Sequence, residues 1–120
     1  MIDVTRFTDF SPLKLPDGYF RIFELGLSHI HPWVFLSTSE ALTLYQELRR
    51  QYPDQHYVPF ARRRDTDDVA CIAPLSENPD RVLLVHVFAT AGWEIDEAYD
   101  SFWSWYRDAV HAMIDLEASQ

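Results

Sequence analysis

The histidines could bind a metal ion, because two of them lie two residues apart. His29 and His31 form an H-x-H pair, and on a strand both rings would point to the same face. His86 or His111 would then be the third ligand of a metal ion. Metal sites usually combine such histidines with closely spaced carboxylates or cysteines, so we interpret the pair as ordinary histidines at a strand start or turn. We interpret His86 as a hydrogen-bonded core residue and His111 as an exposed residue. The sequence therefore predicts no metal site and no cofactor.

The sequence gives little indication of a cysteine nucleophile or of a nucleotide-binding loop. Cys71 is the single cysteine and lies between Ala70 and Ile72 in an apolar segment, where a thiol is typically a small core residue. The three glycines are far apart, and none precedes the Lys-Ser or Lys-Thr pair of a phosphate-binding loop. A hydrolase that uses His29, His31 and a carboxylate remains a third hypothesis, but no general base with a positioning partner can be named. We predict a protein that is not an enzyme.

Acidic residues are distributed unevenly along the chain. Residues 1–60 carry seven acids and five bases (−2) and residues 61–120 carry twelve acids and five bases (−7), which gives the net charge of −9. Four of the acids lie in one short window without a base: Glu94, Asp96, Glu97 and Asp100. One interpretation is the entry to a helix, whose dipole favours acids, on a soluble surface. The other is a surface that attracts a basic protein partner, with Trp93 and Tyr99 as aromatic anchors.

A second charged segment contains both signs. Three arginines, at positions 62–64, are followed at once by aspartates at positions 65, 67 and 68, and these acids cancel the local field of the arginines. This pattern is typical of a solvated hairpin tip. The alternative is a specificity loop in which Arg63 and Asp67 contact a partner.

The composition excludes several classes of protein. A chain of 120 residues with 48% apolar residues is long enough for one domain with its own core. The acidic balance argues against a nucleic-acid binder, which normally presents a basic face. The first residues lack the basic region and apolar stretch of a secretory signal, and the longest clearly apolar run, at 82–85, is far too short to span a membrane. We expect a cytoplasmic protein that contacts neither nucleic acid nor membrane.

The spacing of apolar residues predicts three helices, at about residues 19–26, 39–51 and 101–117. Ser37 and Glu40 form the S-x-x-E arrangement that satisfies free amide groups at the start of the second helix. Asp100 is placed to cap the third helix. That last helix carries a long apolar stripe, so we expect it to lie across a sheet, with Trp103 off the stripe and exposed.

Apolar and β-branched runs predict strands at about residues 30–36, 57–61, 69–73 and 81–89. Polar segments with turn residues separate the last three runs, so these form an antiparallel meander. The run at 81–89 is apolar on both faces, as in a central strand. We predict one domain over residues 1–120, of the α+β class, with a mostly antiparallel sheet of about four to five strands flanked by helices and a long C-terminal helix packed on the sheet.

Several short motifs occur in a fixed order along the chain, namely WVFL at 33–36, YVPFA at 57–61, VACI at 69–72, VLLVH at 82–86 and YDSFWSW at 99–105. In this order, and with the amphipathic helix after the first motif, the sequence resembles the SUKH superfamily, the Smi/Knr-like group. The resemblance covers about residues 12–116. It implies an α+β fold without catalytic activity, in which Trp33, Phe60, Ala61 and Phe102 are structural.

The resemblance also implies a function, because many bacterial members of this superfamily are immunity proteins that bind and neutralise polymorphic toxins, often nucleases. We therefore expect a stoichiometric protein-binding domain whose partner is a basic toxin domain. The alternative is a regulatory or scaffold module that binds a host protein or itself through Trp93, Trp103 or Trp105. The sequence leaves open whether the chain is a monomer or a homodimer.

Overall fold

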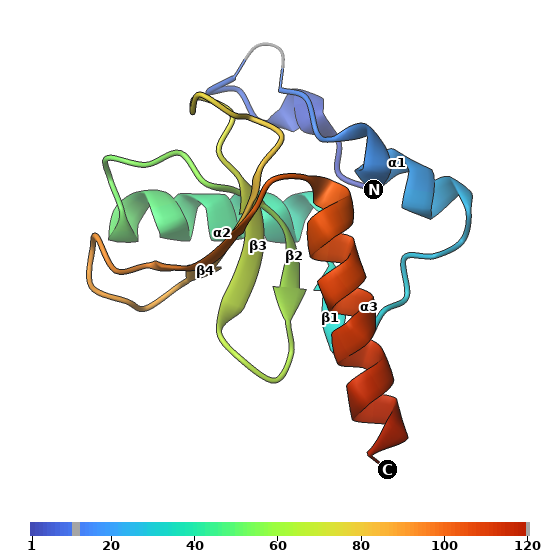
Figure 1. The fold of residues 1–120 in the computed structure, drawn as a ribbon. Coiled ribbons are helices and arrows are strands. Elements are labelled where there is room, and N and C mark those ends of the chain that lie inside the picture. The colour runs from blue at the N-terminus through green and yellow to red at the C-terminus, as the bar shows by residue number, and fades with distance from the viewer. Residues whose placement is uncertain (11–12, 120) are drawn as a thin grey trace.

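Two short helices begin the chain in the computed structural model, which describes residues 1–10 and 13–119. A 3-10 helix spans Val4–Arg6, and α1 spans Asp17–Glu24 (Figure 1). Helix α1 starts two residues earlier than the apolar spacing predicts, because Asp17 follows Pro16 directly and an acid favours the first turn of a helix. A Cβ on Gly18 would lie 2.6 Å from Phe102 Cδ1, so glycine at this position allows α1 to approach the C-terminal helix closely.

Five strands form one antiparallel sheet in the order β1-β2-β3-β4-β5. Their bounds are Trp33–Phe35, Val58–Arg63, Asp68–Ile72, Val82–His86 and Ile95–Tyr99. Strands β2 to β5 follow one another in sequence and in space, while α2 connects β1 to β2 (Figure 1). The predicted α+β class with an antiparallel meander is therefore confirmed.

The last two strands of the sheet, β4 and β5, differ from the sequence-based expectation. Strand β4 ends at His86, whereas the apolar run predicts a strand to residue 89. The backbone turns after this point, and the Tyr52 hydroxyl accepts a hydrogen bond from the Ala89 N–H at 3.0 Å. The following acidic segment, which the sequence suggested as the entry to a helix, forms the edge strand β5; its residues are mostly polar and exposed, so their pattern did not indicate a strand.

Helix α2, Thr38–Gln51, covers one face of the sheet. The predicted capping box is confirmed, since Ser37 Oγ accepts from the Glu40 N–H at 3.2 Å and Glu40 Oε1 accepts from the Ser37 N–H at 3.1 Å. Beneath the C-terminal half of the helix lies an apolar cluster that includes Leu48, Tyr52, Tyr57, Val69, Cys71, Leu83 and Val85. Cys71 is fully buried there and burial raises the pKa of its thiol, as befits a core residue.

Helix α3, Phe102–Ala118, lies on the opposite face (Figure 1). Its N-cap is Ser101, whose Oγ accepts from the Ser104 N–H at 3.2 Å, so the prediction that Asp100 caps the helix is wrong. Phe102, Trp105 and Ala109 are buried in the larger apolar cluster, and no later residue of α3 within the described chain is buried to the same degree. The second half of α3 is therefore only partly buried, with Val110 and Met113 packed against the edge of this cluster. No helix in the described residues combines the length and apolarity needed to cross a membrane.

Candidate functional site

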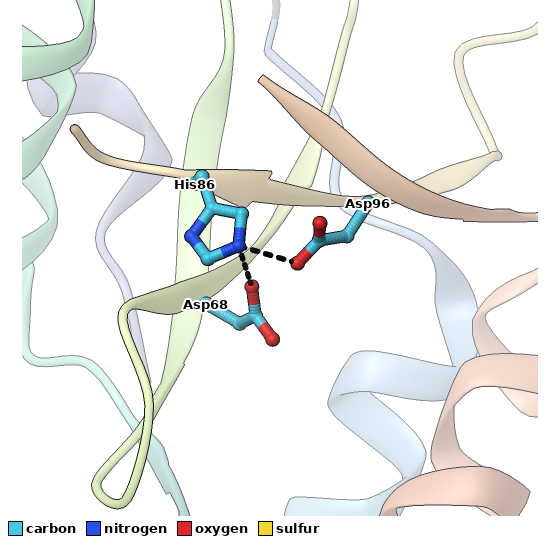
Figure 2. A group of neighbouring side chains, drawn as sticks. All are labelled: Asp68, His86 and Asp96. Atoms are coloured by element: carbon cyan, nitrogen blue, oxygen red, sulfur yellow. Dashed lines mark ion pairs between the residues drawn. The ribbon is translucent and has the colours of Figure 1, made fainter. Parts of the chain in front are cut away.

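Asp68, His86 and Asp96 come together on three neighbouring strands (Figure 2). Asp68 begins β3 and lies directly opposite His86, the last residue of β4, so their side chains share one face of the sheet. The pairing of β4 with β5 is irregular at this point and leaves Asp96 as an extra residue without a direct partner. Such a bulge redirects a side chain, and it brings the Asp96 carboxylate to the His86 imidazole.

The imidazole contacts the two carboxylates unequally. His86 Nε2 is 2.9 Å from Asp96 Oδ2 and 3.7 Å from Asp68 Oδ1, as the dashed lines in Figure 2 indicate. The shorter contact is an ion pair when the imidazole is protonated, whereas the longer one exceeds hydrogen-bonding distance. Asp68 Oδ1 is buried and has no hydrogen-bond partner. The imidazole nitrogen thus pairs with Asp96 and leaves Asp68 Oδ1 without a partner.

Burial raises the pKa of Asp68 to about 6, and the adjacent Asp96 carboxylate adds to the rise, while His86 opposes it. The side chain of Asp68 is only 16% exposed, so water screens the repulsion between the two carboxylates poorly. Near neutral pH the pair is therefore stabilised by any positive charge that enters the cluster.

A groove of about 760 Å³ extends from this cluster along the space between the sheet and the second half of α3. Ala109 is the last buried residue of α3 in the described chain, and beyond it the helix is only partly buried. Trp33 and Trp105 line the groove, and their rings pack edge to face at 5.3 Å. The charged lining is mostly acidic and comprises Asp68, Asp96, Glu97, Asp108 and Asp115 against Arg63 and His111. This composition favours a cationic occupant.

The edge of the sheet next to the groove forms a second feature, which we call the β5 edge surface. It consists of Phe88 and Trp93, in the loop before β5, with Ile95, Glu97 and Asp100. Phe88 is 76% exposed and Trp93 is 82% exposed. Large aromatic side chains this exposed are typical of a contact surface for another protein.

Most of the predicted partner-binding residues lie on or near this edge. Trp93, Asp96, Glu97 and Asp100 are exposed. Tyr99 is partly buried, and its hydroxyl donates to Asp108 Oδ2 of α3 at 3.0 Å. Tyr99 therefore supports the groove and is less available than Trp93 as an anchor.

The two predicted contacts in the β2–β3 hairpin lie apart from the β5 edge surface. Arg63 Nε donates to Asp65 Oδ1 at 2.6 Å, and Arg63 also lines the groove. Asp67 is exposed at the tip. Arg63 and Asp65 thus form an ion pair within the hairpin.

Glu94 does not lie on the surface with the other acids of its window. The residue is only 6% exposed. The Tyr57 hydroxyl donates to Glu94 Oε2 at 2.7 Å, and the Gly92 N–H donates to Oε1 at 2.6 Å. Burial alone would raise the pKa of Glu94, but these hydrogen bonds outweigh it and lower the pKa. Glu94 is thus a structural carboxylate and not an exposed contact residue.

The cluster of Asp68, His86 and Asp96 was missed by the sequence analysis, which placed His86 in the core and Asp68 in the hairpin tip. The register of β3 and β4 could have revealed it: when antiparallel strands at 68–72 and 82–86 pair over their full length, Asp68 lies opposite His86. Asp96 required β5 to be recognised as a strand. The H-x-H pair that drew attention first, His29 and His31, precedes β1 and does not belong to the cluster.

Comparisons with known proteins leave the chain without an assigned relative. No family model matches it, and no curated protein or solved structure matches it either. The resemblance to the SUKH superfamily therefore rests on the order of its sequence motifs alone.

Proposed function

We propose that this chain is a non-catalytic protein-binding domain, similar to the toxin-neutralising immunity proteins of the SUKH superfamily, that binds a basic protein through the β5 edge surface. The observation that carries the proposal is an acidic edge strand preceded by two highly exposed aromatic side chains, Phe88 and Trp93. Only the sequence resemblance supports the finer statement that the partner is a toxin.

The edge position of β5 supplies a means of contact. Strand β5 pairs with β4 on one side only, and an edge strand offers backbone N–H and C=O groups to an added strand. Trp93 and Ile95 provide apolar area beside these groups. Exposed tryptophan is the residue type most often found at the energetic centre of a protein interface.

The negative charge of this region favours a positively charged partner. Glu97 and Asp100 are exposed on or beside β5, the adjacent groove is lined mainly by carboxylates, and the whole chain carries −9. Such a field accelerates the approach of a positively charged protein and disfavours acidic ones. A nuclease domain, which is basic because it holds nucleic acid, has the complementary charge.

The proposal is tested by protein capture from the source cells at low and moderate salt, followed by binding kinetics with each purified candidate. Trp93→Ala should weaken affinity about 10-fold or more through lost contact area. The double variant Glu97→Gln/Asp100→Asn should mainly slow association at low salt, by about 3-fold to 10-fold. The matched control is Glu77→Gln/Asp80→Asn, which removes the same charge from the exposed β3–β4 loop.

A basic protein that binds one to one, and loses affinity with the edge variants but not with the control, supports the proposal. If the edge variants and the control bind every captured protein as the wild type does, the β5 edge surface is not the contact. Inhibition of a captured toxin's activity at one equivalent would support the immunity function itself.

The alternative function, a module that binds a host protein or a second copy, has its own candidate contact at Trp103. This side chain is exposed on α3, as predicted, and it borders a pocket with residues of α1. Trp105 is buried and provides no such contact. Sedimentation at increasing concentration, with Trp103→Ala and Trp93→Ala compared, distinguishes the two: dimers lost only in Trp103→Ala would favour the alternative.

A further inference from the structure

We propose that Asp68, His86 and Asp96 form a binding site for a divalent transition-metal ion of the Zn²⁺ or Mn²⁺ class. The three side chains each present one ligand atom, and these atoms all lie within 4.8 Å of one another. The inference does not depend on the proposed protein-binding function, because the cluster lies on the groove side of the sheet and a metal ion alone can be used to test it.

The spacing of the ligand atoms fits a metal coordination shell. In a tetrahedral site with metal–ligand bonds of about 2.1 Å, neighbouring ligand atoms are about 3.4 Å apart. The distances from His86 Nε2, 2.9 Å to Asp96 Oδ2 and 3.7 Å to Asp68 Oδ1, lie on either side of this value. Small rotations of the side chains would make them equal, and the strand pairing already holds all three on adjacent strands.

The second observation is the unpartnered oxygen of Asp68. Oδ1 is buried without a hydrogen bond, and burial of an unpaired carboxylate oxygen is costly unless a cation or a donor meets it. His86 Nε2 carries at most one hydrogen, and its closer contact is with Asp96. A metal ion in place of that hydrogen would contact all three ligand atoms at once.

The groove supplies both attraction and access. Glu97 and Asp108 line the same groove as the cluster, so the local field concentrates cations. Three protein ligands leave at least one coordination position for water or for a group of a bound ligand.

The ligand set indicates the class of ion. Imidazole is a ligand of zinc and of other transition metals, whereas Ca²⁺ and Mg²⁺ prefer sites made of oxygen alone. One imidazole with two carboxylates suits Zn²⁺ and, because of the oxygen majority, Mn²⁺. Ca²⁺ is therefore a useful negative probe, since it would respond to negative charge without requiring His86.

The test is isothermal titration of the chelator-treated full chain with ZnCl₂, MnCl₂ and CaCl₂, each with thermal unfolding at matched metal concentrations. We expect one equivalent of Zn²⁺ or Mn²⁺ per chain, a melting temperature that rises with metal concentration, and weaker binding of Ca²⁺. Asp96→Asn and His86→Ala should each reduce affinity at least about 10-fold, because each removes a ligand. Both side chains are partly exposed, so the variants are expected to fold, which their melting in chelator verifies.

Matched controls separate coordination from diffuse attraction. Asp115→Asn removes the same charge from the same groove, and His111→Ala removes a histidine from its wall. Neither should change affinity by more than about 2-fold, because neither atom belongs to the cluster. The proposal is overturned if the wild type shows no saturable site or if Asp96→Asn and His86→Ala bind the metal as the wild type does. It is also overturned if the control variants lose as much affinity as Asp96→Asn and His86→Ala.

Discussion

Glu94 and Asp68 are two carboxylates withdrawn from solvent on opposite sides of one sheet, and they differ in how their oxygens are satisfied. Glu94, on the side of α2, accepts hydrogen bonds from Tyr57 and Gly92. Asp68, on the side of α3, has an oxygen without a partner and a second carboxylate, Asp96, beside it. The pKa of Glu94 is lowered and that of Asp68 is raised to about 6.

The two environments distinguish a buried charge that stabilises the fold from one that is open to a ligand. A carboxylate that receives its hydrogen bonds from the protein stabilises the structure in its ionised form. A carboxylate that lacks them destabilises the ionised form until something positive arrives. On this basis Glu94 holds the β4–β5 loop, and Asp68 belongs to a binding site.

The largest expected effect comes from Glu94→Gln, which replaces an acceptor of two hydrogen bonds by an amide that also carries donors. We expect a loss of about 2 kcal/mol in the free energy of unfolding at pH 7, measured by urea denaturation. Since the folded pKa of Glu94 lies below its unfolded value of 4.5, this stabilisation is present above pH 4.5 and is lost as the pH falls through the folded pKa. A difference between wild type and variant that persists undiminished at pH 3 would contradict this account.

Asp68→Asn should have the opposite sign. In the presence of chelator, the folded protein must ionise Asp68 at a pKa of about 6, against an ordinary value of 3.8. The wild type therefore loses stability relative to the variant as the pH rises from about 4 to 6. At pH 7.5 the variant should be more stable by about 1–2 kcal/mol, and near pH 3.5 the two should be equal. A variant less stable than the wild type at pH 7.5 would show that Asp68 is satisfied internally, as Glu94 is.

The contrast between these two acids could not be predicted from the sequence, although much of the fold could. The capping box at Ser37 and Glu40, the α2 helix and the β2–β3–β4 meander follow from local patterns, and the structure confirms them. Glu94 and Asp96 look alike in sequence as members of one acidic window. Only the bulge in the β4–β5 pairing, which depends on contacts between strands, separates the buried acid from the exposed one.

Strand β5 shows the same limit of local patterns. Its sequence, Ile-Asp-Glu-Ala-Tyr, has little apolar alternation, so its pattern does not indicate a strand. It forms a strand because β4 offers an unpaired edge and because Tyr99 contacts Asp108 of α3. The assembly of Asp68, His86 and Asp96 depends on this strand, so the candidate site was hidden for the same reason.

Tyr57→Phe makes Glu94 resemble Asp68, because it leaves a buried Glu94 oxygen without its hydrogen-bond donor. The substitution keeps the ring among Tyr52 and its neighbours but removes the hydrogen bond to Glu94. We expect a loss of about 1 kcal/mol at pH 7 and a folded pKa for Glu94 closer to its unfolded value of 4.5, visible as a smaller loss of stability when the pH falls below 4.5. An unchanged acid titration curve would mean that the Gly92 N–H alone keeps the carboxylate ionised.

Asp115→Asn should have the smallest effect, and it tests whether burial or mere membership of the acidic groove matters. Asp115 lines the same groove as Asp68, but it is exposed on α3, where water screens it from the other carboxylates. The free energy of unfolding should stay within about 0.5 kcal/mol of the wild type from pH 4 to pH 8, as measured by the same urea series. A pH-dependent gain as large as that of Asp68→Asn would attribute the strain to the summed charge of the groove, and Asp68 would then lose its distinction from the other acids that surround it.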